Sequence, residues 1–98
     1  MDKMTPVKIK HIIAQGEGLT VEFKEKYSSK IDRDIVALSN SKGGYILLGV
    51  KDDNTIIGER LTNQMKAEIL QLARNCDPQI NISRVFLIDH VVVIDQPH

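Results

Sequence analysis

The sequence has little cysteine, few aromatic residues and no long apolar run, and each shortage excludes a class of protein. A single cysteine, Cys76, excludes a disulfide framework and a cysteine-based zinc site. With no Trp and only 4% aromatic residues, the core must consist mainly of Ile, Leu and Val. No apolar run approaches the roughly 18 residues of a membrane span, and the N-terminus has no apolar signal-peptide segment. We therefore expect a cytoplasmic protein with no membrane association.

The chain also lacks net charge, so its composition does not require a nucleic-acid partner. The charges are nevertheless unevenly distributed. Residues 1–51 contain nine Lys/Arg and six Asp/Glu, whereas residues 52–98 contain four and seven. This distribution permits a basic face in the first half of the chain, although surface charge is usually just solvated.

What is present is typical of one small globular domain. The chain has 98 residues, of which 42% are hydrophobic and 27% are charged. We interpret residues 1–98 as a single domain. The sequence ends directly after a strongly apolar segment, and we therefore expect it to be the N-terminal part of a longer protein.

Helical spacing of apolar residues predicts three helices, two of them in the first half of the chain. The first begins at Thr5-Pro6, a capping residue followed by proline at the first helical position, and ends at Gly16. The second begins at Ser29, which we predict to form a capping box with Asp32, and ends within residues 39–42.

The third predicted helix begins at Thr62 or Asn63 and ends at Asp77-Pro78. Its apolar residues recur at helical spacing as far as Cys76, which we predict to be a core residue.

The remaining apolar segments predict strands. The first alternates between apolar and polar residues, so it should be half-buried, whereas the second is continuously apolar and should be covered on both faces. The third would return from the second in a hairpin, and the last two would be joined by a tight turn at Asp89-His90. The fold class is therefore α+β, with a small mixed β-sheet and about three helices. The predicted strands are residues 19–26, 45–50, 55–58, 80–88 and 91–95.

Two adjacent glycines, Gly43 and Gly44, stand directly before the second predicted strand. Gly43 can supply the positive φ that ends a helix, and Gly44 lets the backbone turn into the strand. Gly49, inside the strand, indicates a close approach by another segment. These roles require no ligand.

Three motifs occur in an order that resembles the Schlafen/AlbA-type domain, earlier grouped as a "divergent AAA" domain. They are Glu22-Phe23-Lys24, the segment from Asn40 to Gly44, and the segment from Gly49 to Gly58. The resemblance covers roughly residues 14–96. The chain departs from the family at residues 39–41, Ser-Asn-Ser where Ala-Asn-Thr is common, and at Lys51, where an acidic residue is frequent.

The resemblance implies a nucleic-acid-binding module, with double-stranded DNA as partner, in a transcriptional regulator. For this binding role we expect no cofactor. Older family descriptions propose ATP binding, but the sequence has no phosphate-binding loop of Gly-x-x-x-x-Gly-Lys-Ser/Thr type. Basic side chains would contact phosphates, helped by an amide and by backbone N–H groups at the paired glycines. The predicted contact residues are Lys24, Lys26, Lys30, Arg33, Asn40, Lys42, Gly43 and Gly44.

A second implication of the resemblance is a metal-dependent endoribonuclease. Glu17, Glu22 and Asp52 match the three carboxylates of the Schlafen nuclease cluster. Clustered carboxylate oxygens are suited to Mg²⁺ or Mn²⁺, which can activate water for phosphodiester cleavage. The alternative is that Glu22 is an ordinary outward-facing strand residue and Asp52 a turn residue.

A third possibility is a dimerisation or interaction module. Residues 85–94 have more apolar surface than one face of a sheet can bury, and Alba-like proteins commonly dimerise. Either a partner chain or a C-terminal continuation of this chain would cover that surface, and we expect a homodimer.

Overall fold

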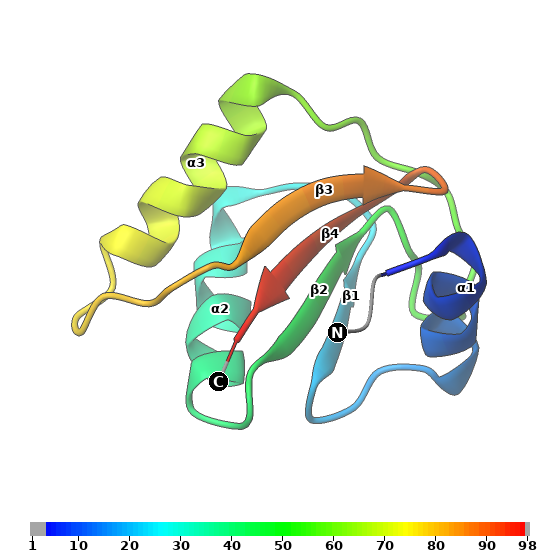
Figure 1. Ribbon diagram of the computed structural model, residues 1–98, viewed down its shortest axis with the longest axis horizontal. Coiled ribbons are helices and arrows are strands. Elements are labelled where there is room, and N and C mark those ends of the chain that lie inside the picture. The colour runs from blue at the N-terminus through cyan, green and yellow to red at the C-terminus, as the bar shows by residue number, and fades with distance from the viewer. Residues whose placement is uncertain (1–3, 98) are drawn as a thin grey trace.

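A four-stranded sheet with helices on both faces forms the domain (Figure 1). The structure is a computed structural model and describes residues 4–97. No helix in this part of the chain is long and apolar enough to cross a membrane. In chain order the elements are α1 (Pro6–Gln15), β1 (Val21–Lys24), the 3₁₀ helix η1 (Ser29–Ile31), α2 (Asp32–Ser39), β2 (Gly44–Leu48), α3 (Asn63–Arg74), β3 (Arg84–Ile88) and β4 (Val91–Gln96).

The sheet is mixed, as the sequence predicts. Its strand order is β1-β2-β4-β3, with β1 parallel to β2 and both other pairs antiparallel. The central strands β2 and β4 are therefore flanked on both sides, while β1 and β3 form the two edges (Figure 1). The α+β prediction is confirmed.

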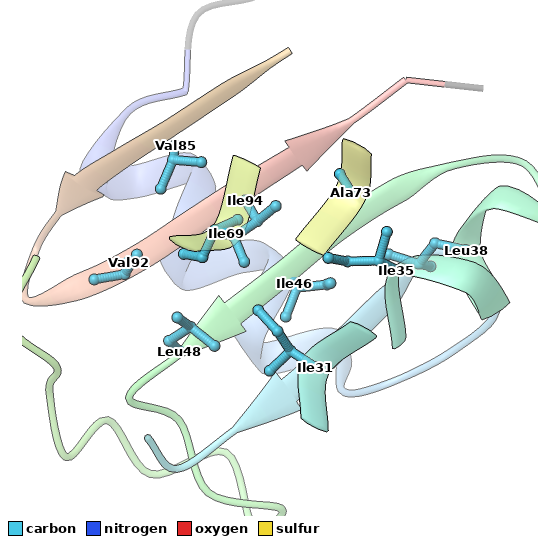
Figure 2. Packing of buried hydrophobic residues seen from close by; sticks show 10 residues of the cluster. All are labelled: Ile31, Ile35, Leu38, Ile46, Leu48, Ile69, Ala73, Val85, Val92 and Ile94. Carbon is cyan, nitrogen blue, oxygen red and sulfur yellow. The ribbon is translucent and has the colours of Figure 1, made fainter. Parts of the chain in front are cut away.

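Alternate residues of the central strands supply two separate cores. One lies under α2 and α3, where Ile46 and Leu48 of β2 and Ile94 of β4 meet residues such as Ile35 and Ile69 (Figure 2). The other lies under α1 and contains Ile9, Ile13, Phe23, Leu47, Val50, Val91 and Val93. The prediction that the second strand is covered on both faces is therefore confirmed.

The predicted helix starts are confirmed for α1 and α3. The hydroxyl oxygen of Thr5 accepts a hydrogen bond from the N–H of Lys8, and that of Thr62 accepts one from Met65. The prediction for the second helix is wrong by one residue. Ser28 rather than Ser29 is the cap, because the segment opens with a 3₁₀ turn before α2 begins.

The predicted return strand at residues 55–58 is wrong. Only a single bridge joins Val50 and Ile56. Gly49 and Gly58 both have positive φ, and a Cβ on Gly49 would lie 2.6 Å from the carbonyl carbon of Gly58. The two segments bend and pack closely at Gly49 and Gly58, and this contact replaces a regular ladder of strand hydrogen bonds. The side chain of Ile57 remains 50% exposed.

Two further boundaries differ from the sequence predictions. β3 begins at Arg84 rather than at residue 80, although Ile80 and Ile82 still pack against the core beneath α3. Cys76 is half-buried rather than a core residue. α3 ends at Arg74, so the cysteine lies beyond the last helical turn and does not continue its buried face. Its Sγ donates to the carbonyl oxygen of Leu72.

The paired glycines are explained by backbone geometry. Gly43 has a φ of 71°, and its N–H donates to the carbonyl oxygen of Leu38 at 2.8 Å, which closes the end of α2. Gly44 has a φ of 139°, and a Cβ there would lie 1.9 Å from the carbonyl oxygen of Thr20. Only glycine lets the start of β2 approach the entry to β1 this closely.

The apolar excess on which we based a homodimer is buried within the chain. β4 is central and covered on both faces, and Val85 of β3 is also buried. Of the large apolar side chains in residues 85–94, only Leu87 is more than a third exposed, at 51%. The homodimer stays a prediction, but the apolar surface from which we predicted it is buried inside the domain.

Candidate functional site

Charged side chains gather at the β1 edge of the sheet. Phe23 of β1 points into the core beneath α1, so its neighbours Glu22 and Lys24 point to the opposite face, where α2 lies. Asp34 of α2 meets them there, and Glu17 reaches in from the segment before β1. Two of the predicted carboxylates, Glu17 and Glu22, are therefore brought together.

Glu17 satisfies a backbone group at this edge. Its Oε2 accepts a hydrogen bond from the N–H of Phe23 at 2.9 Å. Because β1 pairs only with β2, its other edge has no strand partner in residues 4–97. The carboxylate therefore takes the place of a neighbouring strand, a structural role that needs no metal.

The environment of Glu22 disfavours its charged form. Burial raises the pKa of Glu22 above its ordinary value of 4.5, and the hydrogen bond and charge of Glu17 and the charge of Asp34 raise it further. Lys24 acts in the opposite direction, and its Nζ lies 3.4 Å from Oδ2 of Asp34. The single cation thus compensates several carboxylates in part.

Asp52 does not join this cluster as a metal ligand. It is exposed in the turn after Val50, where the neighbouring Asp53 accepts a hydrogen bond from the N–H of Thr55. Within residues 4–97, no three His, Cys, Asp or Glu side chains form a group able to hold a metal ion. The set of Glu17, Glu22 and Asp52 therefore does not fit Mg²⁺ or Mn²⁺ in this structure, and the nuclease role stays a prediction.

The predicted basic residues divide into one that is paired and four that are exposed. Lys24 is held by Asp34. The ion pairs described for residues 4–97 do not include the other four, which we call the α2 cation surface because they stand on η1, on α2 and in the loops next to them. Its members are Lys26, Lys30, Arg33 and Lys42, and all four are exposed.

Two of the three residues predicted to support phosphate binding, Gly43 and Gly44, already contact other parts of the chain. The N–H of Gly43 is committed to Leu38, and Gly44 approaches Thr20 rather than open space. Asn40 ends α2 and remains exposed, beside a hollow of about 280 Å³ that Cys76 also lines. Asn40 is thus the predicted supporting residue that keeps an exposed side chain.

Tyr27 packs against the core and is tied to two acidic residues. Its ring packs against the core beneath α3, its hydroxyl donates to Glu68, and its N–H donates to Glu59. Burial, with the hydrogen bond and charge of Glu68, raises the pKa of Tyr27 to about 12. Tyr45 likewise packs against the core beneath α1.

A second group of cations was missed by the sequence analysis. Lys66, Arg74 and Arg84 line one groove between α3 and β3. These residues lie in the half of the sequence with excess negative charge and are far apart along it. The fold brings these three residues together, and no local sequence motif indicates that they are neighbours.

The comparison with known families agrees with the motifs of the sequence. The family model described as Schlafen, AlbA_2 matches residues 17–94, which run from the segment before β1 into β4. No curated protein matches the chain. Since the match covers most of the sequence, the chain belongs to the Schlafen, AlbA_2 family.

Proposed function

We propose that this domain binds nucleic acid, specifically double-stranded DNA, through the α2 cation surface. The observation that carries the proposal is that Lys26, Lys30, Arg33 and Lys42 are exposed and take part in none of the ion pairs described for residues 4–97. Membership of the Schlafen, AlbA_2 family supports a nucleic-acid-related role. The proposed binding needs no cofactor.

The arrangement suits contacts with several phosphates. Lys26 lies in the loop before η1, and Lys30 lies in η1. Arg33 follows in the first turn of α2, and Lys42 lies beyond the end of α2. An eight-residue helix is about 12 Å long, whereas one DNA strand carries a charge roughly every 3.4 Å along the axis. The two ends of the surface would therefore meet different phosphates of one backbone.

Contacts of this kind position a protein on DNA without reading its sequence. We further propose that the domain serves a transcriptional regulator, in which target choice comes from elsewhere. This step rests on the family resemblance alone. The domain by itself should then bind duplexes of different sequence with similar affinity.

Fluorescence anisotropy of a labelled duplex tests the proposal. We expect affinity to fall as salt rises from roughly 50 to 200 mM, with a slope of about −3 to −4 in the logarithmic plot if all four cations meet phosphates. The substitution Lys30→Ala should weaken binding to every duplex and reduce that slope by about 1.

The matched control is Lys10→Ala, an exposed lysine of α1 on the other face of the sheet, 3.9 Å from Asp89. It should leave the slope unchanged. Absence of binding at the lower salt concentration, or equal losses in the two variants, would reject the α2 cation surface as the binding site.

A further inference from the structure

A groove lies between α3 and β3. β3 is the edge strand of the sheet opposite β1 (Figure 1). The volume of the groove is about 530 Å³, and a neighbouring hollow of about 230 Å³ shares Leu70, Arg74 and Ile82 with it. Together they follow the chain from residue 79 to residue 86. We call this the α3–β3 groove.

The groove follows the backbone edge of β3 rather than one face of the sheet. Ser83, Arg84, Val85 and Phe86 all line it, although successive side chains of a strand point to opposite faces. Val85 packs beneath α3, and Phe86 packs against the core beneath α1. Four consecutive residues can line one groove only where it runs along their shared edge, which has no strand partner in the part of the chain described.

The groove is basic. Lys66 and Arg74 contribute from α3 and Arg84 from β3, and no acidic residue is among those that line it. The guanidinium of Arg84 lies 4.6 Å from the centre of the Phe86 ring and 3.6 Å from Oδ2 of Asp95. It is thus held in place, yet its side chain is still 53% exposed.

We propose that the α3–β3 groove binds an extended acidic peptide segment, which adds to β3 as a further antiparallel or parallel strand. An unpaired strand edge offers backbone donors and acceptors at the spacing of another strand, and an adjacent helix forms the outer wall. The half-buried Leu70 and Ile82 supply the apolar contact. Lys66 and Arg74, with the part of Arg84 that stays exposed beside Asp95, favour carboxylates.

Other occupants fit less well. A nucleic acid has no alternating N–H and C=O groups with which to pair along a strand edge. A second copy of this chain would bring its own Lys66, Arg74 and Arg84 against the same three cations. An acidic peptide satisfies both the backbone and the charges. The proposal concerns a different surface from the α2 cation surface and does not depend on DNA binding.

The test is titration of the isotopically labelled chain, followed by amide chemical shifts. The probe is a peptide of about eight residues, the length that spans the groove at roughly 3.4 Å per residue, in which Glu alternates with Val. One control carries N-methyl groups on alternate residues, which keeps the charge and removes backbone donors. Another replaces Glu with Lys.

We expect saturable shifts in residues 82–88 and 66–74 with the Glu–Val peptide, and much weaker effects with either control. Lys66→Glu with Arg74→Glu should weaken binding about tenfold or more, because two exposed cations become anions. Lys26→Glu with Lys30→Glu makes the same change in charge on the α2 cation surface and should leave peptide binding unchanged.

Several results would overturn the proposal. They are the absence of saturable shifts, equal binding of the N-methylated peptide, displacement of the peptide by single-stranded DNA, and shifts at β3 that depend on protein concentration alone. The last would identify a second copy as the occupant. A duplex titration of the same samples reports on DNA binding separately, so failure of either proposal can be recognised by itself.

Discussion

The two edges of the sheet, β1 and β3, have different surroundings. At β1 the strand is four residues long, Glu17 occupies the N–H of Phe23, and an ion pair between Lys24 and Asp34 lies alongside. At β3 the edge faces a groove lined by cations. Unpaired edges invite other strands unless their backbone groups are already occupied. We infer that the hydrogen bond from Phe23 to Glu17 closes β1 to strand addition, whereas β3 is the edge at which we propose that a peptide adds.

The carboxylates at β1 are therefore explained first by the edge that they close. Burial, and then the neighbouring Glu17, raise the pKa of Glu22, so its charged form is held there at an energetic cost. Glu17 gains a backbone hydrogen bond in return. The proximity of Glu17 and Glu22 can therefore be explained without a metal. These two are also part of the three-carboxylate cluster that the resemblance to Schlafen nucleases implies.

The largest expected effect comes from breaking the joint between β1 and β2. In Gly44→Ala the new Cβ would lie 1.9 Å from the carbonyl oxygen of Thr20, at a φ that L-residues rarely adopt. We expect a loss of about 3 kcal/mol or more in the free energy of unfolding, measured with urea.

Gly18→Ala is the matched control, because no atom lies within 4 Å of a Cβ there. It should change stability by less than about 1 kcal/mol. Similar losses in both variants would show that the close approach at Gly44 is not what requires glycine.

A smaller effect is expected from opening the closed edge. Glu17→Ala removes the acceptor of the Phe23 N–H and should cost about 1 kcal/mol. Hydrogen exchange at the Phe23 amide should become faster, whereas Glu17→Gln keeps an acceptor and should retain most of the protection. Glu25→Ala, an exposed carboxylate next to the same strand, should be neutral. Unchanged exchange in Glu17→Ala would contradict the edge-closing role.

The charge on Glu22 should make stability depend on pH. Its pKa is raised above 4.5 in the folded state, so the folded state binds the proton more tightly than the unfolded state. The stabilising contribution is complete below that value and is lost as pH rises through the folded pKa.

Glu22→Gln should therefore be more stable than the parent chain near neutral pH, and this advantage should vanish in acid. Urea denaturation at several pH values measures the difference directly. A parent chain that gains stability relative to Glu22→Gln as pH rises would contradict the repulsion among these carboxylates.

The smallest expected effect concerns the contact between α3 and the segment after β1. Glu68→Gln should lower the pKa of Tyr27 from about 12 towards its ordinary value of 10.0, because it removes the charge that helps hold the proton. Ultraviolet absorbance of tyrosinate follows this titration. Glu25→Gln should leave it unchanged, and an unaltered Tyr27 in Glu68→Gln would show that burial alone sets its pKa.

Local sequence patterns predicted much of the fold, because helix ends and tight turns depend on interactions between residues close together in the chain. The hydroxyls of Thr5 and Thr62 cap helices, and the glycine pair ends α2 and admits β2, as their positions in the sequence indicate. Residues 55–58 failed because their apolar pattern resembles a strand, while two backbones meeting at Gly49 and Gly58 prevent a ladder.

The candidate sites were predicted less completely, because they depend on the spatial arrangement of distant segments. The motif match predicted a cluster of Glu17, Glu22 and Asp52. Glu17 and Glu22 do lie together, but their further neighbour is Asp34 of α2, which pairs with Lys24 and which no local motif indicates. The α3–β3 groove combines residues 66, 74 and 84, whose adjacency follows only from the strand order.

The most direct test of the account is a duplex-DNA titration of two charge-reversal variants with the same change in net charge. One is Lys30→Glu with Arg33→Glu on the α2 cation surface, and the other is Lys66→Glu with Arg74→Glu in the α3–β3 groove. We predict that the first variant loses affinity at least about tenfold and that the second changes little. Equal losses would mean that net charge rather than a defined surface attracts DNA, and a greater loss in the second would place the DNA-binding surface at the β3 edge.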